Sequence, residues 1–271
     1  MAAERFGAWP GWLLAPWAFW RGEAGLRPSL LWEQRAGLEL VHLLASPVYY
    51  GVGVPRGDGA PVLLLPGFLG SDGYLMPLYG WLRRIGYRPF LAGFAVTLGP
   101  IRDLLARVVR RVDELARACG RPVTVVGHSL GGILGLSVAR LRPDAVVHVV
   151  TLGSPLGEEP RRSAHPLVGV LAHFLLTGAV TWRALADERA LERALLGSPL
   201  PPGLRLSCVY SREDAVVDFR DCVHADPRAA AYEVRGTHLG LAWNAEVYRL
   251  LGRLLASTTE VPLSGAASEL P

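Results

Sequence analysis

A serine bracketed by two glycines is the strongest chemical signal in the sequence. Ser129 lies in Gly127-His128-Ser129-Leu130-Gly131, after the apolar run Val123 to Val126 and before the helix-compatible segment Leu130 to Leu141. A nucleophilic serine needs a sharp strand-to-helix turn, in which side chains two positions away on either side would collide, so glycine fits there. The following helix would direct its first N–H groups at developing negative charge. The alternative is a strand–helix connection with an incidental serine, and the flanking strand and helix patterns favour the nucleophile.

His238 is the histidine whose position suits a general base for Ser129. It lies in the short loop Gly236 to Gly240, after the last predicted strand, Ala229 to Val234. A histidine there could take the serine proton and later return it to a leaving group. Other histidines have simpler explanations, because they lie in apolar segments or should point away from the serine: His42, His148, His173 and His128.

A carboxylate must orient that histidine, and we predict Asp214. It follows the predicted strand Leu204 to Tyr210 and precedes apolar residues that could anchor its loop. A buried carboxylate fixes the imidazole tautomer and stabilises the imidazolium. The chain order serine, acid, histidine is also the order of one known arrangement of catalytic triads. The rivals for the acid are Glu213, Asp218 and Asp221, and Asp218 could instead cap the segment that follows it.

Two backbone N–H groups are expected to form an oxyanion hole beside the serine. One belongs to Leu130, the residue after the nucleophile. We place the other at Phe68, in the turn-rich loop Pro66 to Asp72 that follows the apolar run Pro61 to Leu65. Glycines on either side of Phe68-Leu69 would let the backbone approach a substrate closely. An ordinary strand–helix loop is the alternative interpretation of this segment.

Apolar runs alternate with amphipathic segments along most of the chain. The expected strands are Pro61 to Leu65, Tyr87 to Phe94, Val123 to Val126, Ala145 to Leu152, Leu204 to Tyr210 and Ala229 to Val234. The expected helices are Leu30 to Leu44, Tyr74 to Ile85, Ile101 to Ala118, Leu130 to Leu141 and Trp243 to Leu255. Continuous apolar strands separated by helices predict an α/β fold, with a mostly parallel sheet and helices on both faces.

The organisation outside this core is less regular. Residues 1–58 contain Trp9, Trp12, Trp17, Trp20 and Trp32 of the chain's 8 tryptophans, and we expect this extension to pack on the core. Contact with a membrane surface is the alternative, because tryptophan favours that interface. The core domain is expected over residues 59–256. It is interrupted by an insertion at about 156–203, whose uncharged part, Leu167 to Trp182, would form a helical cap over Ser129 or else pack on the core. Residues 257–271 read as a flexible tail.

Composition narrows the possible partners. The 271 residues are 51% hydrophobic, enough for one large core. The formal net charge is +4, and all 28 basic residues are arginine, scattered without a long basic run. A nucleic-acid partner is therefore not expected. The segment Leu167 to Trp182 and the tryptophan-rich extension leave contact with a membrane surface open.

The cysteines and the N-terminal residues bear on cofactors and location. Cys119, Cys208 and Cys222 show no C-x-x-C spacing, so neither a zinc site nor redox chemistry is indicated. A bridge between Cys208 and Cys222 is conceivable, although small buried thiols are favoured. No metal or organic cofactor is implied. No secretion signal or secure membrane-spanning run is recognised, so we expect a cytoplasmic protein that could still contact a membrane.

Taken together, these motifs resemble bacterial lipases and esterases of the α/β-hydrolase superfamily. The resemblance covers residues 60 to 256 and rests on Gly127 to Gly132, Leu65 to Phe68, Thr151-Leu152-Gly153-Ser154-Pro155, Asp214 and Gly236-Thr237-His238. Two departures argue against a triglyceride lipase. Many lipases have His-Gly where this chain has Pro66-Gly67, and many have histidine after Ser-Pro where Leu156 stands here.

The resemblance implies a serine hydrolase acting on small-molecule or lipid esters of apolar acyl groups. Ser129, activated by His238 and Asp214, would form an acyl-enzyme, with the N–H groups of Phe68 and Leu130 binding the oxyanion. Acyl transfer to an acceptor other than water is an alternative that uses the same residues. A non-catalytic binding protein on the same fold is a second alternative.

Overall fold

Six apolar runs of the sequence form one parallel sheet. The computed structural model describes residues 20–22, 25–27, 30–157, 197 and 199–259. The strands are β3 (Pro61–Leu65), β4 (Arg88–Leu91), β5 (Val123–His128), β6 (Val146–Leu152), β7 (Arg205–Tyr210) and β8 (Ala230–Glu233). Their order is β4-β3-β5-β6-β7-β8, and every neighbouring pair is parallel.

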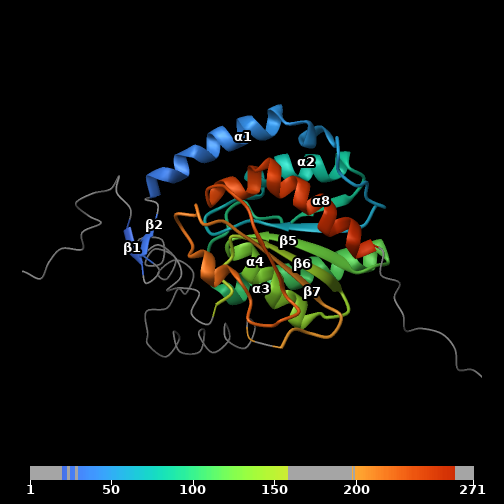
Figure 1. Ribbon diagram of the computed structural model, residues 1–271. Helices are drawn as coiled ribbons and strands as arrows, with labels where there is room; N and C mark the ends of the chain where they lie inside the picture. Colours follow the sequence, from blue (N-terminus) through green and yellow to red (C-terminus); the bar gives the residue numbers. More distant parts are fainter. Residues whose placement is uncertain (1–19, 23–24, 28–29, 158–196, 198, 260–271) are drawn as a thin grey trace, which may run out of the picture.

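Helices cover both faces of this sheet (Figure 1). One face carries α2 (Met76–Arg84) and α8 (Ala245–Thr259), with α1 (Ala36–Ala45) packed against α8. The opposite face carries α3 (Ile101–Cys119) and α4 (Leu130–Leu141). Each layer encloses its own apolar cluster against the sheet, and every residue of β3 and β5 is buried. The predicted parallel sheet with helices on both faces is confirmed.

The helix α3 shows how directly the sequence pattern becomes packing. The predicted apolar stripe of this helix is buried, and its members are Leu104, Leu105, Val108, Val112 and Leu115. The helix ends at Gly120, whose φ of 64° is left-handed and suits a residue without a side chain. The hydrophobic stripe therefore fixes which face of α3 meets the sheet.

Some elements differ in extent from the prediction. The expected helix from Leu30 begins as the 3₁₀ segment η2 (Leu30–Arg35) before α1. The strand expected from Tyr87 to Phe94 is limited to β4. The helix α8 runs to Thr259, past the expected start of a tail at residue 257, because Arg205 donates to the carbonyl and hydroxyl oxygens of Ser257.

Several predictions concern residues outside the described part. Residues 1–19, which contain Trp9, Trp12 and Trp17, belong to this group. So do residues 158–196, which make up most of the expected cap, and residues 260–271 of the expected tail. Among the helices that are described, none combines the length and the apolar character needed to cross a membrane.

The direction of the strand order reverses between β3 and β5. From β3 the chain moves outward to β4, then crosses back over β3 to place β5 on the other side. The carboxyl ends of β3 and β5 lie side by side, with Leu65 paired to Gly127. Parallel α/β sheets bind ligands at such a reversal, because the two following loops diverge there. The loops in question carry Phe68 and Ser129.

Candidate active site

Ser129 occupies a strained turn between β5 and α4. Its φ and ψ are 54° and −121°, a conformation that side-chain-bearing residues rarely adopt. Such backbone strain costs about 1–3 kcal/mol and persists where the surroundings enforce it. The Ser129 N–H donates to the carbonyl oxygen of Leu152 over 2.8 Å, which ties the turn to the neighbouring strand β6. The turn presents the serine at the carboxyl edge of the sheet.

The glycines around Ser129 are required by close backbone contacts. A Cβ at Gly127 would overlap the backbone of Gly131 and the residue after it. A Cβ at Gly131 would overlap the carbonyl oxygen of Leu65, at the end of β3. The motif therefore lets α4 start directly over the sheet edge, which is the geometric role that the sequence argument gave to these glycines.

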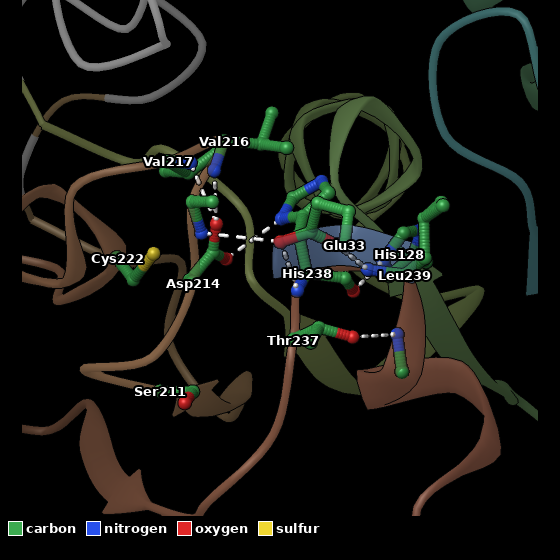
Figure 2. Close-up of polar contacts among 12 residues, drawn as sticks. Glu33, His128, Ser211, Asp214, Val216, Val217, Cys222, Thr237, His238 and Leu239 are labelled. Atoms are coloured by element: carbon green, nitrogen blue, oxygen red, sulfur yellow. Dashed lines mark hydrogen bonds and ion pairs between the residues drawn. The ribbon is translucent and has the colours of Figure 1, made fainter. Parts of the chain in front are cut away.

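His238 and Asp214 form a buried pair (Figure 2). The His238 Nδ1–H donates to Asp214 Oδ2 over 2.7 Å, and the two residues are 4% and 1% exposed. The other oxygen, Oδ1, accepts the N–H groups of Val216 and Val217 at 2.8 and 2.7 Å. Because an ionised carboxylate can only accept, the shared proton belongs to His238 Nδ1. The Nε2 atom of that ring is thus left as the proton acceptor.

The rival acids have other contacts. Asp218 lies at the N-terminus of the 3₁₀ segment η5 (Phe219–Cys222), and its Oδ1 accepts the N–H of Arg220 at 3.1 Å. The carbonyl oxygen of Asp221 accepts the N–H groups of Leu156 and Gly157. The structure thus places the carboxylate of Asp214 against the histidine, and it gives Asp218 the capping contact that the sequence left open.

The loop after β3 lies directly beside Ser129. A Cβ at Gly67 would come within 3.0 Å of Ser129 Cβ, so the backbone at this position passes closely over the nucleophile candidate. The N–H of Gly67 donates to the Tyr74 hydroxyl at 2.8 Å, and the N–H of Leu69 donates to the carbonyl oxygen of Thr97 at 3.0 Å. Both neighbours of Phe68 are therefore held in place.

The backbone N–H groups of Phe68 and Leu130 are the predicted donors of the oxyanion hole. Among the hydrogen bonds that join described residues to one another, neither N–H is a donor. Leu130 is the first residue of α4, where the first N–H groups have no partner inside the helix. Unpaired donors beside a serine are what an oxyanion hole requires.

His128 connects the elements on either side of the nucleophile candidate. Its Nδ1 accepts from the Tyr74 hydroxyl at 2.9 Å, and its Nε2–H donates to the carbonyl oxygen of His238 at 2.8 Å. Burial lowers the pKa of His128 to about 3, so the ring is neutral near pH 7 and the direction of these hydrogen bonds is fixed. The rings of His128 and His238 lie 4.8 Å apart between centroids. Sequence reasoning did not foresee these contacts of His128.

Comparison with solved structures shows what fold this arrangement belongs to. The lipase BlEst2 of Bacillus licheniformis matches at a TM-score of 0.53 and 17% identity, over 75% of this chain and 95% of that one. A structure from work on LipS and LipT, two metagenome-derived lipolytic enzymes, matches at 0.52 and 17%, over 77% and 96%. The monoacylglycerol lipase of Paleococcus ferrophilus matches at 0.50 and 15%, over 76% and 97%. The chain therefore has the α/β-hydrolase fold. No protein-family model matches it.

Two acidic residues contact the candidate site and were missed by the sequence argument. Glu33, in η2, accepts hydrogen bonds from the backbone beside Asp214 and His238. Glu39, in α1, accepts the N–H of Thr237 at 2.9 Å. One signal was present: a Cβ on either glycine of the Gly236 to Gly240 loop would crowd the Glu39 carboxylate. Paired glycines indicate a close approach, but not which residue approaches.

The described residues contain neither a candidate metal cluster nor a disulfide. In the portion that the structure describes, there is no group of three or more His, Cys, Asp or Glu residues that could hold a metal ion. Cys119, Cys208 and Cys222 form no disulfide with one another, and the last two are buried. The conceivable bridge between Cys208 and Cys222 is therefore not formed.

Proposed function

We propose that this α/β-hydrolase cleaves carboxylic esters of apolar acyl groups with Ser129 as nucleophile, His238 as general base and Asp214 as the orienting acid. The observation that carries this proposal is the 2.7 Å hydrogen bond between His238 Nδ1 and Asp214 Oδ2, buried beside the strained serine turn. It fixes the tautomer in which His238 Nε2 can accept a proton. Solved structures of similar fold that are described as lipases support an ester as the substrate.

The proposed reaction has two steps. His238 Nε2 takes the proton of the Ser129 hydroxyl while the oxygen attacks the ester carbonyl carbon, and the oxyanion is bound by the N–H groups of Phe68 and Leu130. The imidazolium, stabilised by Asp214, then gives the proton to the departing alcohol, which leaves an acyl-enzyme. A water molecule, deprotonated by His238, releases the carboxylic acid and restores the serine.

Exposed apolar side chains beside the site support an apolar acyl group. Leu69 follows Phe68 and is 43% exposed, and Leu239 follows His238 and is 44% exposed. Val96 and Leu98, on either side of the residue that binds the Leu69 N–H, are also exposed. Exposed apolar side chains close to a catalytic site are typical of ligand-binding positions. Whether the ester is a soluble molecule or part of a lipid surface is decided by assaying both.

The test is hydrolysis of a series of p-nitrophenyl esters from acetate to laurate, with labelling by a fluorophosphonate. We expect wild-type activity that favours longer acyl chains, and the loss of both hydrolysis and labelling in Ser129→Ala. The matched control is Ser137→Ala, which changes a buried serine within α4 and should keep both. Labelling or hydrolysis that persists in Ser129→Ala at the wild-type level would refute the nucleophile.

Acyl transfer is the second candidate, because the same acyl-enzyme can react with an alcohol or thiol instead of water. Product analysis with an added alcohol separates the two. A product ratio that follows the molar excess of water indicates a hydrolase, whereas ester formation at low alcohol concentration indicates a transferase. If the fluorophosphonate labels the protein but neither hydrolysis nor acyl transfer is detected, the third option, a binding protein on this fold, is favoured.

A further inference from the structure

Glu33 lies between the two loops that hold the proposed acid and base (Figure 2). Its Oε1 accepts the N–H of Ala215 at 3.2 Å and the N–H of His238 at 3.0 Å. Its Oε2 accepts the N–H of Leu239 at 3.0 Å. Ala215 follows Asp214 directly in the chain, so one carboxylate joins the backbone next to the acid with the backbone of the base.

We propose that Glu33 is a positioning residue of this site: it sets the separation of Asp214 and His238 and adds a second negative charge next to the imidazole. For its kinetic consequences this inference rests on the proposed function. The contacts themselves, and the electrostatic effect on His238, do not depend on which reaction the protein catalyses.

The geometric part follows from how the loops are otherwise held. The His238 loop leaves the end of β8 and the Asp214 loop leaves the end of β7, and these two residues are 24 positions apart in the chain. Their side chains meet at 2.7 Å, a distance that tolerates little drift of either backbone. A carboxylate that accepts from both backbones limits such drift, because stretching the gap would break hydrogen bonds on one side.

The electrostatic part follows from the charges around His238. Among the described residues, Asp214, Glu33 and the neutral ring of His128 face it, and Glu39 binds the N–H of the preceding residue, Thr237. Burial is the main cause that raises the pKa of Glu33, and the charge of Asp214 raises it further, while the N–H donors of Leu239 and His238 oppose both. When ionised, Glu33 favours the imidazolium that the mechanism requires. The base is thereby stronger than Asp214 alone would make it.

A different explanation is that Glu33 merely anchors its own segment to the core. Glu39 already provides such an anchor, since it accepts from Thr237 and from the side chain of Asn244. Glu33 differs because it contacts both loops of the site. An anchor would affect the unfolding temperature only, whereas a positioning residue also changes kcat and the titration of His238.

The experiment compares Glu33→Gln, which keeps the shape but removes the charge, with Glu33→Asp and the control Glu246→Gln. Glu246 is exposed and accepts the N–H of Arg235, so the control removes a loop-bound carboxylate outside the site. The first readout is the titration of His238 in histidine-labelled protein by NMR, with the signal assigned through His238→Asn. The second is the pH profile of kcat/KM on the ester used for the wild type, with active sites counted by fluorophosphonate labelling.

For Glu33→Gln we expect the pH midpoint of the His238 titration to fall by roughly 0.5 to 1 pH unit. The acidic limb of kcat/KM should move down by the same amount, and kcat per labelled site should fall about 10-fold with little change in KM. Glu33→Asp should restore part of the midpoint shift, and Glu246→Gln should match the wild type. An unchanged His238 midpoint together with unchanged kcat in Glu33→Gln would overturn the inference, even if the unfolding temperature dropped. If no ester is hydrolysed by the wild type, the proposed function fails, while the NMR titration still decides this inference.

Discussion

The Nε2–H of His128 donates to the main-chain carbonyl oxygen of His238 over 2.8 Å. The residue before the proposed nucleophile therefore holds the backbone of the proposed base. The same ring accepts from Tyr74, whose hydroxyl receives the N–H of Gly67 in the loop beside Ser129. These bonds form one directed chain from the loop after β3 to the loop after β8, because the neutral ring of His128 can donate only from Nε2.

Tyr74→Phe should interrupt that chain without emptying the space filled by the ring. The N–H of Gly67 and the Nδ1 of His128 would both lose their partner, and buried unsatisfied groups cost about 1–3 kcal/mol each. We expect a lower free energy of unfolding in urea and a several-fold loss of kcat, because the Phe68 N–H is no longer held in place. Tyr74 lies in the 3₁₀ segment η4 (Asp72–Leu75), and Tyr79→Phe in the adjoining helix α2 is the control. Equal kcat for the two variants would contradict a role for the chain in catalysis.

Asp214→Asn should lower kcat by about 10³ to 10⁴-fold with a small change in KM. The amide of asparagine would present a donor or a weaker acceptor to His238 Nδ1, so the favoured tautomer would no longer keep Nε2 unprotonated. Asp218→Asn keeps an oxygen that can cap η5 and should retain nearly full activity. The measurement is kcat and KM for both variants. If Asp218→Asn lost kcat while Asp214→Asn kept it, the orienting acid would be Asp218 instead of Asp214.

Gly131→Ala should strongly destabilise the fold, because its Cβ would overlap the carbonyl oxygen of Leu65 and backbone would have to move. Gly80→Ala is the matched control in the middle of α2, where nothing lies within 4 Å of an added Cβ. It should raise the free energy of unfolding by roughly 0.5–1 kcal/mol through higher helix propensity. Thermal unfolding measures both, and similar unfolding temperatures would show that α4 can shift away from β3.

Mild acid should destabilise this protein. Burial lowers the pKa of His128 and of His148 to about 3, whereas an unfolded histidine titrates near 6.5. Between those values the unfolded chain binds more protons than the folded one, so stability falls as the pH drops from about 6.5 toward 3. At pH 5 the expected loss is about 2 kcal/mol for each of the two histidines.

The variant His148→Gln isolates one of these contributions. A glutamine cannot be protonated, yet it can still bond the hydroxyls of Ser207 and Thr258 that the histidine contacts at 3.0 and 2.7 Å. In urea titrations, the loss between pH 7 and pH 5 should shrink by about 2 kcal/mol in this variant. A loss equal to that of the wild type would mean that His148 is protonated in the folded protein.

Local sequence patterns were sufficient for the central elements. The strand over Pro61–Leu65 and the helix over Leu130–Leu141 have the predicted bounds, because a continuous apolar run and a glycine turn mark their limits within a few residues. The choice between Asp214 and Asp218 rested on position along the loop alone. The contact with His238 depends on the direction in which that loop leaves β7, and composition does not encode direction.

The contacts of Glu33, Glu39 and Tyr74 lie beyond such patterns. In the sequence, Glu33 looks like an ordinary polar residue of a short helix. Its partners are backbone N–H groups, which nearly every residue type has, so the sequence does not reveal them. Gly236 and Gly240 are different, because a close neighbour leaves no room for a side chain at either position. We did not interpret these glycines in that way from the sequence, and the structure shows that the close neighbour is the carboxylate of Glu39.

The hydrogen bonds of Glu33 have a consequence for the order of folding. They span 182, 205 and 206 positions of the chain, so Glu33 must wait during synthesis until residues far later in the chain have been made. Closing so long a loop is entropically costly and is repaid only once the intervening sheet is in place. The sheet can thus form before the acid and base loops are locked, and a refolding chain should regain its near-native secondary structure earlier than its reactivity toward fluorophosphonate.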